Sequence, residues 1–176
     1  ETVRLIEAAG GKAAYVPVDV RNWDDVDRAY GDAVAAVGAL GIAVHAAGIS
    51  DGYAQADAVA PIVWERVIGI NLTGTFWCCK RALHELGPRG GRIVNIASTA
   101  GLIGDGGGPA YVASKHGVVG LTRSMANTLS KHRIRVNSVH PTGVAADSTG
   151  RQADSAMGTG DMSAMGELFE AEPLFV

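Results

Sequence analysis

The sequence predicts an α/β fold in which a doubly wound parallel sheet alternates with helices. Three observations lead to this prediction. Short apolar runs at 42–44, 93–96 and 134–139 are typical of buried strands. Longer segments between them place apolar residues at helical spacing, and glycines or prolines mark the junctions. A length of 176 residues with 47% apolar side chains is sufficient for a single domain with its own core.

The first part of the chain is predicted to contain two helices and an edge strand. Residues 1–9 have a helical pattern that two glycines end. Residues 13–20 have the pattern of a strand, and Pro17 restricts that strand to a sheet edge because proline has no N–H to donate. Asn22 is predicted to cap a helix that runs to residue 37.

The rest of the chain continues the alternation of strands and helices. In order, we expect a strand at 42–44, a loop at 49–60, a long helix from Pro61, a strand at 91–98, a helix at 111–129 and a strand at 134–139. Residues 145–176 mix glycine, serine, aspartate and methionine, and we expect a substrate lid or a poorly ordered segment there. Met157, Met162 and Met165 would line such a lid, since thioethers adapt to irregular ligands.

The composition argues against several classes of protein. A net charge of −3 gives no reason to expect nucleic acid or an anionic membrane as a partner. The histidines, cysteines and carboxylates have no metal-ligand spacing, so we expect no metal. The adjacent Cys78 and Cys79 suggest no disulfide framework and fit a reducing cytoplasm.

The stretch from Ser98 to Lys115 carries the clearest chemistry. Tyr111 and Lys115 share one face of a predicted helix, and a glycine-rich loop can return Ser98 to that face. A tyrosine hydroxyl titrates at about 10, but an ammonium ~4 Å away stabilises a phenolate by roughly 4 kcal/mol at an effective dielectric of about 20. Such a tyrosine can exchange a proton with an alcohol or carbonyl, while a serine donates a hydrogen bond to the same oxygen. Taken alone, Tyr-x-x-x-Lys also fits an ordinary amphipathic helix.

These residues and three further motifs resemble the short-chain dehydrogenase/reductase family. Asn71 lies in an Ile-Asn-Leu-Thr-Gly segment, residues 91–98 match the family's serine strand, and residues 133–141 match the strand that leads to its cofactor loop. The resemblance implies an NAD(P)-dependent oxidoreductase on a Rossmann fold. The Pro-Thr-Gly turn at 141–143 is most similar to the subgroup of carveol dehydrogenase and the mycofactocin-coupled dehydrogenases. That subgroup favours NAD and a hydrophobic alcohol.

The resemblance implies a role for each matching residue. Tyr111 would be the acid/base, Lys115 would tune it and bind a ribose, and Ser98 would hold the substrate oxygen. Asn71 would sit at a local kink that frees a backbone carbonyl for a relay water, unless it is only a tolerated polar residue. Cofactor contacts would come from Asp19, Val20, Ala46, Ala47, Gly48, Tyr111, Lys115, Pro141, Gly143 and Val144. For Asp19, capping of the next helix is an equal alternative.

The sequence departs from the family pattern in three places. His45 and Ala46 stand where the family usually has asparagines, so an amide hydrogen bond is in doubt, and we expect His45 to be a satisfied core histidine. Residues 145–147 replace a threonine that usually contacts the cofactor. By resemblance, residues 1–176 lack the N-terminal βαβ unit with its glycine-rich phosphate turn and the C-terminal strand. The chain would then be one partial Rossmann-type domain.

The sequence therefore predicts hydride transfer between NAD, with NADP not excluded, and a small hydrophobic secondary alcohol or ketone. Two alternatives stay open: reduction of a 3-oxoacyl thioester, and an inactive truncated paralogue that acts as a scaffold. The family implies a cytoplasmic homotetramer that pairs the helices of Asn71 and Tyr111 across subunits, where Phe76 or Trp77 could serve as contacts.

Overall fold

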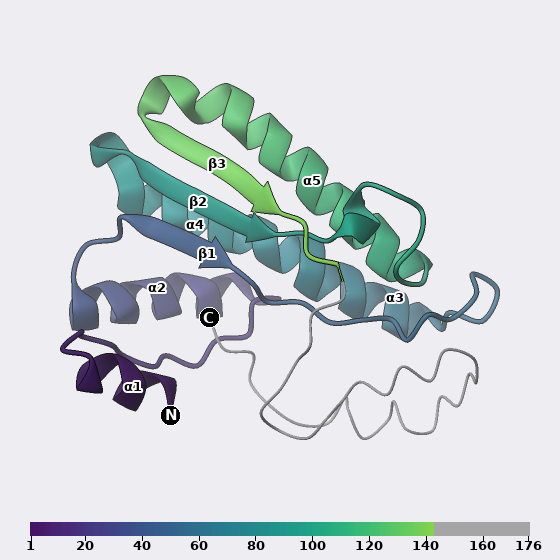
Figure 1. Ribbon diagram of the computed structural model, residues 1–176, viewed down its shortest axis with the longest axis horizontal. Coiled ribbons are helices and arrows are strands. Elements are labelled where there is room, and N and C mark those ends of the chain that lie inside the picture. The colour runs from purple at the N-terminus through teal and green to yellow at the C-terminus, as the bar shows by residue number, and fades with distance from the viewer. Residues whose placement is uncertain (143–176) are drawn as a thin grey trace.

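A computed structural model describes residues 1–142, and the strands in this range form one parallel sheet (Figure 1). Strands β1 (Ile42–His45), β2 (Gly91–Ile96) and β3 (Ile134–Val139) lie in the order β1-β2-β3. In this register Ala43 pairs with Ile93, and Ile93 pairs with Val136. The parallel sheet with helices between its strands confirms the predicted α/β fold of the Rossmann type.

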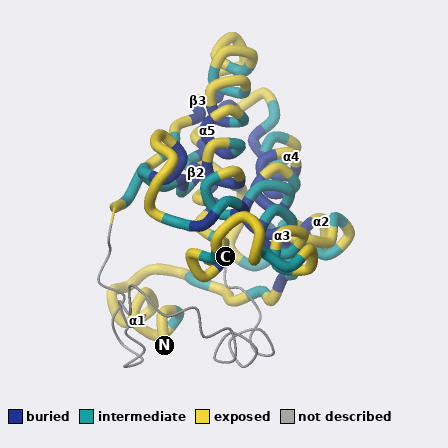
Figure 2. Tube along the Cα trace, turned by 90° about the vertical axis from the view of Figure 1, so that its right-hand side faces the viewer, coloured by how far each residue is buried: buried dark blue, intermediate teal, exposed yellow. Residues whose placement is uncertain are grey.

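In the described part of the chain, helices α2 (Trp23–Val37), α4 (Thr75–Leu86) and α5 (Pro109–Leu129) pack on one face of the sheet (Figure 1). Alternate strand residues point towards these helices and are buried, as the dark segments of Figure 2 indicate. The buried members of this core are Ala43, Cys79, Ala82, Leu86, Ile93, Ile134 and Val136. Removal of such apolar surface from water stabilises the fold by about 25 cal/mol per Å². The core thereby fixes the strand ends on which the site is built.

Residues 13–20 do not form the predicted edge strand. The segment has no regular secondary structure, although Val18 and Val20 are buried against α2. Among the described strands, β1 pairs only with β2. A strand is defined by backbone hydrogen bonds to a neighbour, whereas this segment is held by side-chain packing. The prediction was wrong because apolar periodicity indicates burial and does not identify a pairing partner.

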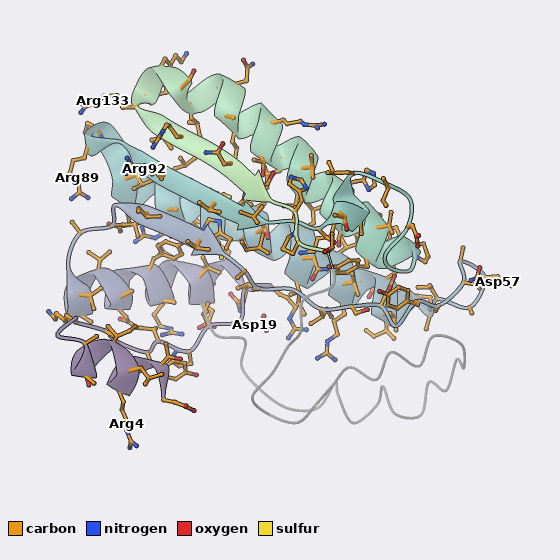
Figure 3. The ribbon with its side chains drawn as sticks, in the orientation of Figure 1. Arg4, Asp19, Asp57, Arg89, Arg92 and Arg133 are labelled. Carbon is orange, nitrogen blue, oxygen red and sulfur yellow. The ribbon has the colours of Figure 1, made fainter. Side chains whose placement is uncertain are left out.

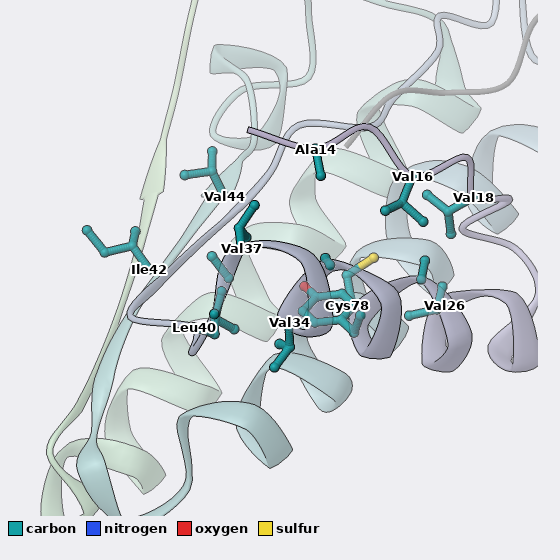
Figure 4. A pocket seen from close by; sticks show the side chains of 15 residues that line it. Ala14, Val16, Val18, Val26, Val34, Val37, Leu40, Ile42, Val44 and Cys78 are labelled. Atoms are coloured by element: carbon teal, nitrogen blue, oxygen red, sulfur yellow. The ribbon is translucent and has the colours of Figure 1, made fainter. Parts of the chain in front are cut away.

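An apolar groove of about 280 Å³ lies between this segment and β1 (Figure 4). Side chains from the segment, from α2 and from the β1 edge form its walls, and they include Val16, Val18, Val34, Leu40, Ile42 and Val44. Ile42 and Val44 are 55% and 50% exposed on the face of β1 that turns away from the core. Residues 13–20 and β1 therefore form opposite walls of a groove and do not pair as strands.

The long helix predicted from Pro61 changes its winding at Asn71. Helices α3 (Pro61–Ile68) and α4 are joined by a π-helical turn, η1 (Gly69–Gly74). The Asn71 carbonyl accepts a hydrogen bond from the Thr75 hydroxyl at 2.8 Å. Asparagine amides compete for backbone groups in helices, and π-helical turns are frequent at functional sites. The predicted local distortion is present, and its carbonyl already accepts one hydrogen bond.

The amino ends of the strands carry exposed arginines. Arg89, Arg92 and Arg133 gather at this end of the sheet (Figure 3). The carboxyl ends of α4 and α5 lie nearby, and cations stabilise the partial negative charge of a helix carboxyl end. The predicted catalytic residues lie at the opposite end of the sheet, where parallel strands of this fold class bind their ligands.

The remaining described elements are short. They are α1 (Thr2–Ala8) and the 3₁₀ turns η2 (Gly87–Arg89), η3 (Thr99–Gly101) and η4 (Ser130–His132). Helix α2 begins as predicted, because the Asn22 side chain accepts hydrogen bonds from two backbone N–H groups of the first turn. Gly143, Val144 and residues 145–176, with the three methionines assigned to a lid, lie outside the described residues.

Candidate active site

The predicted catalytic residues come from three places at the carboxyl end of the sheet. Ser98 follows β2 by two residues, Tyr111 lies in the first turn of α5, and Asn71 lies in η1. Lys115 is one helical turn beyond Tyr111. The helix α5 contacts both η1 and η3, so these elements form one compact region.

Lys115 lies beside the Tyr111 ring and is almost completely buried. Its Nζ is 5.5 Å from the ring centroid, and its side chain has 5% exposure. The ammonium donates one hydrogen bond, to the Ile96 carbonyl at 2.9 Å, and no carboxylate within residues 1–142 forms an ion pair with it. Burial lowers the pKa of Lys115 to about 8, so the group is still mainly charged at pH 7. Two ammonium hydrogens have no acceptor among the described residues.

Ser98 and its loop pack closely against the turn of α5 that carries Lys115. The Ser98 hydroxyl accepts a hydrogen bond from the Ala100 N–H at 3.2 Å, which leaves its own hydrogen free to be donated. A Cβ on Gly101 would lie 2.7 Å from the Lys115 carbonyl oxygen, so only glycine allows this approach. The Tyr111 hydroxyl also has no hydrogen-bond partner among residues 1–142.

Asn71 and Ser114 connect η1 to α5 by a chain of hydrogen bonds. The Asn71 amide donates to the Ser114 hydroxyl at 3.0 Å, and that hydroxyl donates to the Tyr111 carbonyl at 2.7 Å. Asn71 also binds both backbone groups of Ile49, as acceptor at 2.8 Å and as donor at 2.9 Å. Sequence reasoning missed Ser114, although its position between Tyr111 and Lys115 is a usable signal. We call Asn71, Tyr111, Ser114 and Lys115 the site network.

A second residue that sequence reasoning missed is Asp51. Its carboxylate is completely buried and accepts hydrogen bonds from the N–H groups of Gly108 and Tyr111, both at 2.9 Å. The available signal was the start of α5, where Gly108 and Pro109 offer no capping side chain. A helix that begins in this way needs a cap from elsewhere.

The predicted cofactor contacts are distributed along the same end of the sheet. Ala46, Ala47 and Gly48 follow β1 directly, and a Cβ on Gly48 would lie 3.5 Å from Lys115 Nζ and 3.4 Å from Asn71 Oδ1. The Pro141 carbonyl accepts from the Thr99 N–H at 3.0 Å, which ties this turn to the loop after Ser98. Gly143 and Val144 are outside the described range.

Asp19 and Val20 lie earlier in the chain, at the end of residues 13–20. Asp19 pairs with Arg21 at 2.6 Å, and the side-chain hydrogen bond from Arg21 holds the pKa of Asp19 below its usual range. Val20 is buried against η1, where a Cβ on Gly74 would lie 2.7 Å from it. Asp19 does not cap α2, since Asn22 occupies that position.

The prediction for His45 is confirmed, because every polar atom of its ring has a partner in the core. Tyr30 Oη lies 2.9 Å from His45 Nε2, and Asn95 Oδ1 lies 2.9 Å from His45 Nδ1. The Asn95 amide donates to Thr122, so its oxygen faces the ring and His45 is protonated on Nδ1. Burial lowers the pKa of His45 and keeps it neutral. We call Tyr30, His45, Cys79, Asn95 and Thr122 the core network.

Burial also determines the protonation of the two cysteine thiols. Both thiols are free and buried, and burial raises the pKa of each to about 12. Cys79 belongs to the core network through a contact of 3.4 Å from its Sγ to Asn95 Oδ1. Within residues 1–142, histidines, cysteines and carboxylates form no group of three that could hold a metal ion. No helix in this range is both long and apolar enough to span a bilayer.

The geometry defines a Rossmann-type protein with a serine, a tyrosine and a lysine at the ligand-binding end of its sheet. A family profile described as short chain dehydrogenase matches residues 1–156. The chain belongs to the short-chain dehydrogenase family.

Named relatives agree with this assignment. A (−)-trans-carveol dehydrogenase of Rhodococcus erythropolis is 40% identical over 82% of this chain and 53% of its own length. A 3β-hydroxysteroid dehydrogenase of Mediterraneibacter gnavus is 35% identical over 94% of this chain and 60% of its own length. An NAD-dependent oxidoreductase of Mycobacterium tuberculosis is 40% identical over 80% of this chain and 52% of its own length. The chain thus spans little more than half the length of these relatives.

Proposed function

We propose that this protein moves hydride between NAD and a hydrophobic secondary alcohol or its ketone, with Tyr111 as the acid/base. The observation that carries the proposal is the buried Lys115 ammonium beside the Tyr111 ring, which has no carboxylate partner in the described chain. Burial of an unpaired charge is costly, so a fold keeps one where ligands or chemistry use it. Here the charge lies beside the phenol that would exchange the proton.

Each residue of the site has a role that its contacts support. Tyr111 would take the hydroxyl proton of an alcohol or return it to a ketone, because its own hydroxyl has no other described partner. Ser98 would donate its free hydrogen to the substrate oxygen and stabilise negative charge there. Asn71 would hold the start of loop 49–60 and anchor a proton relay from Lys115.

The residues present fit a nicotinamide cofactor. Lys115 has two ammonium hydrogens available for the hydroxyls of a ribose, and the adjoining Gly48 leaves room for a close approach. Ala46, Ala47 and Pro141 would line the same cradle, with Gly143 and Val144 beyond it, while Asp19 and Val20 would flank the adenine end. When bound, the nicotinamide would supply or accept the hydride. The relative named an NAD-dependent oxidoreductase favours NAD over NADP.

The proposed substrate class rests on what the relatives are named for. Carveol and a 3β-hydroxysteroid are both cyclic secondary alcohols with large apolar surfaces. Reduction of a 3-oxoacyl thioester is the second enzymatic candidate, and it predicts turnover with a carrier-bound acyl group. An inactive scaffold is the third, which the free Tyr111 and Ser98 hydroxyls do not favour.

Assembly as a cytoplasmic homotetramer is a further part of the proposal. The helices that would pair across subunits, η1–α4 and α5, carry Phe76 at 42% exposure. Trp77 is less available for a contact between subunits, since it packs against Trp23 with 5.5 Å between ring centroids.

The test is a turnover assay on the purified protein with NAD or NADP and a panel of cyclic secondary alcohols, followed by nicotinamide absorbance. The proposal expects oxidation of these alcohols with NAD. Turnover confined to 3-oxoacyl thioesters would replace it with the second candidate. Absence of turnover with every substrate and both cofactors would favour the scaffold.

A further inference from the structure

Asp51 is a fully buried carboxylate that caps a helix far from it in sequence. Its Oδ1 accepts from the Gly108 N–H and its Oδ2 from the Tyr111 N–H, each at 2.9 Å, across 57 and 60 positions of sequence. In an ordinary capping box, one side chain takes the N–H of the third helical residue and another takes the N–H of the cap residue. Asp51 alone makes both bonds for α5. Its negative charge also lies at the positive end of the helix dipole.

The residues at the start of α5 and those that follow Asp51 both accommodate this contact. A Cβ on Gly108 would lie 2.6 Å from Asp51 Oδ2, so a local capping side chain at Gly108 and the Asp51 carboxylate exclude one another. On the other side, Gly52 and Tyr53 both have positive φ, 74° and 60°. The Tyr53 conformation is strained for a residue with a Cβ, and the Tyr53 N–H returns to Asp51 Oδ1 at 3.4 Å.

The contact joins loop 49–60 to the residue proposed to do the chemistry. Asn71 holds this loop at Ile49, two residues before Asp51. Asp51 then binds the backbone of Tyr111 itself. Gly107 completes the arrangement, because a Cβ there would lie 2.5 Å from Tyr111 Cδ1. Loop 49–60, the start of α5 and the Tyr111 ring are therefore fixed with respect to one another.

We infer that Asp51 is a positioning residue: it sets the place of Tyr111 relative to loop 49–60. The inference rests on the proposed role of Tyr111. Displacement of a reacting group by about 1 Å can cost ~100-fold in rate. A plain helix cap would affect stability, whereas a positioning residue affects kcat in protein that is fully folded.

The decisive experiment separates two roles of Asp51: the capping of α5 and the connection of loop 49–60 to Tyr111. Asp51→Ala removes both, whereas the double variant Asp51→Ala with Gly108→Ser restores a local cap without the connection to loop 49–60. We expect Asp51→Ala to lower kcat about 10- to 100-fold, leave KM for NAD within about twofold, and lower Tm by about 3 °C. The double variant should regain Tm but not kcat. Amide hydrogen exchange at Tyr111 should be faster in Asp51→Ala, because its acceptor is gone.

The matched control is Thr122→Val, which removes both hydrogen bonds of a buried hydroxyl on the same helix. Thr122 accepts from Asn95 at 2.9 Å and lies about 16 Å beyond Tyr111 at 1.5 Å per residue. It should lower Tm by a similar amount and keep kcat within about twofold of the wild type. Asp51→Asn, which keeps the shape and one acceptor oxygen, serves if Asp51→Ala does not fold, and it should lower kcat by a smaller factor.

The inference is overturned if the Asp51 variants keep the wild-type kcat or if the double variant regains it. It is also overturned if Thr122→Val lowers kcat as much as Asp51→Ala does. Tyr111→Phe, assayed in parallel, separates this failure from failure of the proposed function. An inactive Tyr111→Phe beside an active Asp51→Ala rejects only the role of Asp51. An active Tyr111→Phe rejects the role of Tyr111 and, with it, the role of Asp51.

Discussion

Two groups of polar side chains, most of them buried, lie on the same scaffold, and they differ in how far their hydrogen bonds are completed. In the core network, His45 has a partner at each ring nitrogen, and Asn95 bonds through both its oxygen and its amide. In the site network, the Tyr111 hydroxyl and two hydrogens of Lys115 have no partner among residues 1–142. Burial alone therefore does not mark function. A buried donor without an acceptor does, because a ligand can complete it.

A large effect on both turnover and stability, which would sharpen this comparison, is expected at Lys115. Lys115→Met should lower turnover about 100- to 1,000-fold, as expected for loss of the group that assists the acid/base. The same change should raise Tm. Burial lowers the pKa of Lys115 from 10.5 to about 8, so the charged form is disfavoured at every pH below about 8 and the cost disappears as the pH rises to 10.5.

The size of this stabilisation follows from that pKa and from the hydrogen bond that is lost. The burial cost is at most about 3 kcal/mol, and the bond to the Ile96 carbonyl offsets about 1 kcal/mol. The remaining ~2 kcal/mol corresponds to a Tm about 5 °C higher at pH 7. Thermal unfolding and turnover of the same sample check both parts. If the substitution lowered Tm, the buried ammonium of Lys115 would be stabilised by its contacts, as the polar groups of the core network are.

The opposite outcome is expected in the core network. Asn95→Ala would remove the acceptor of the His45 Nδ1–H and the donor to the Thr122 hydroxyl, and it would open a cavity beside Cys79. We expect the free energy of unfolding to fall by about 3 kcal/mol, with kcat of the folded protein within about twofold of the wild type. Denaturant titration and turnover below the melting range measure the two quantities. A selective loss of kcat would place Asn95 in the catalytic machinery.

A smaller effect is expected from the titration of His45. Burial is the main cause that lowers its pKa, against a weaker raising effect of the hydrogen bond with Asn95. The unfolded chain therefore binds a proton from about pH 6.5 downward while folded His45 stays neutral. The contribution of His45 to stability should be constant above that pH and fall by up to about 1.4 kcal/mol per pH unit below it. His45→Gln should flatten this part of the profile, and an unchanged slope would assign it to other groups.

The sequence was sufficient for every element whose evidence is local. Helix α5 follows from apolar spacing, the Tyr111–Lys115 pair from one helical turn, and the N-cap of α2 from Asn22. Residues 13–20 show the limit, because their burial was predicted and their lack of a strand partner was not.

The residues that sequence reasoning missed share a non-local cause. Asp51 is an ordinary loop aspartate by composition, and only the fold brings it to the start of α5. Ser114 likewise gains its importance from Asn71, which lies 43 positions earlier. Spacing can identify a group that acts along one helix, but it does not reveal contacts between elements that are distant in sequence.

The most direct test of the account compares two tyrosines that each lose only a hydroxyl. Tyr111→Phe should lower kcat/KM for a cyclic secondary alcohol with NAD by about 1,000-fold and leave Tm within about 1 °C. Tyr30→Phe, which leaves His45 Nε2 without its partner, should keep kcat/KM and lower stability by about 1–2 kcal/mol. Measured side by side, this crossed pattern is the predicted result. Retention of turnover by Tyr111→Phe, under conditions where the wild-type protein turns over, would contradict the assignment of the site.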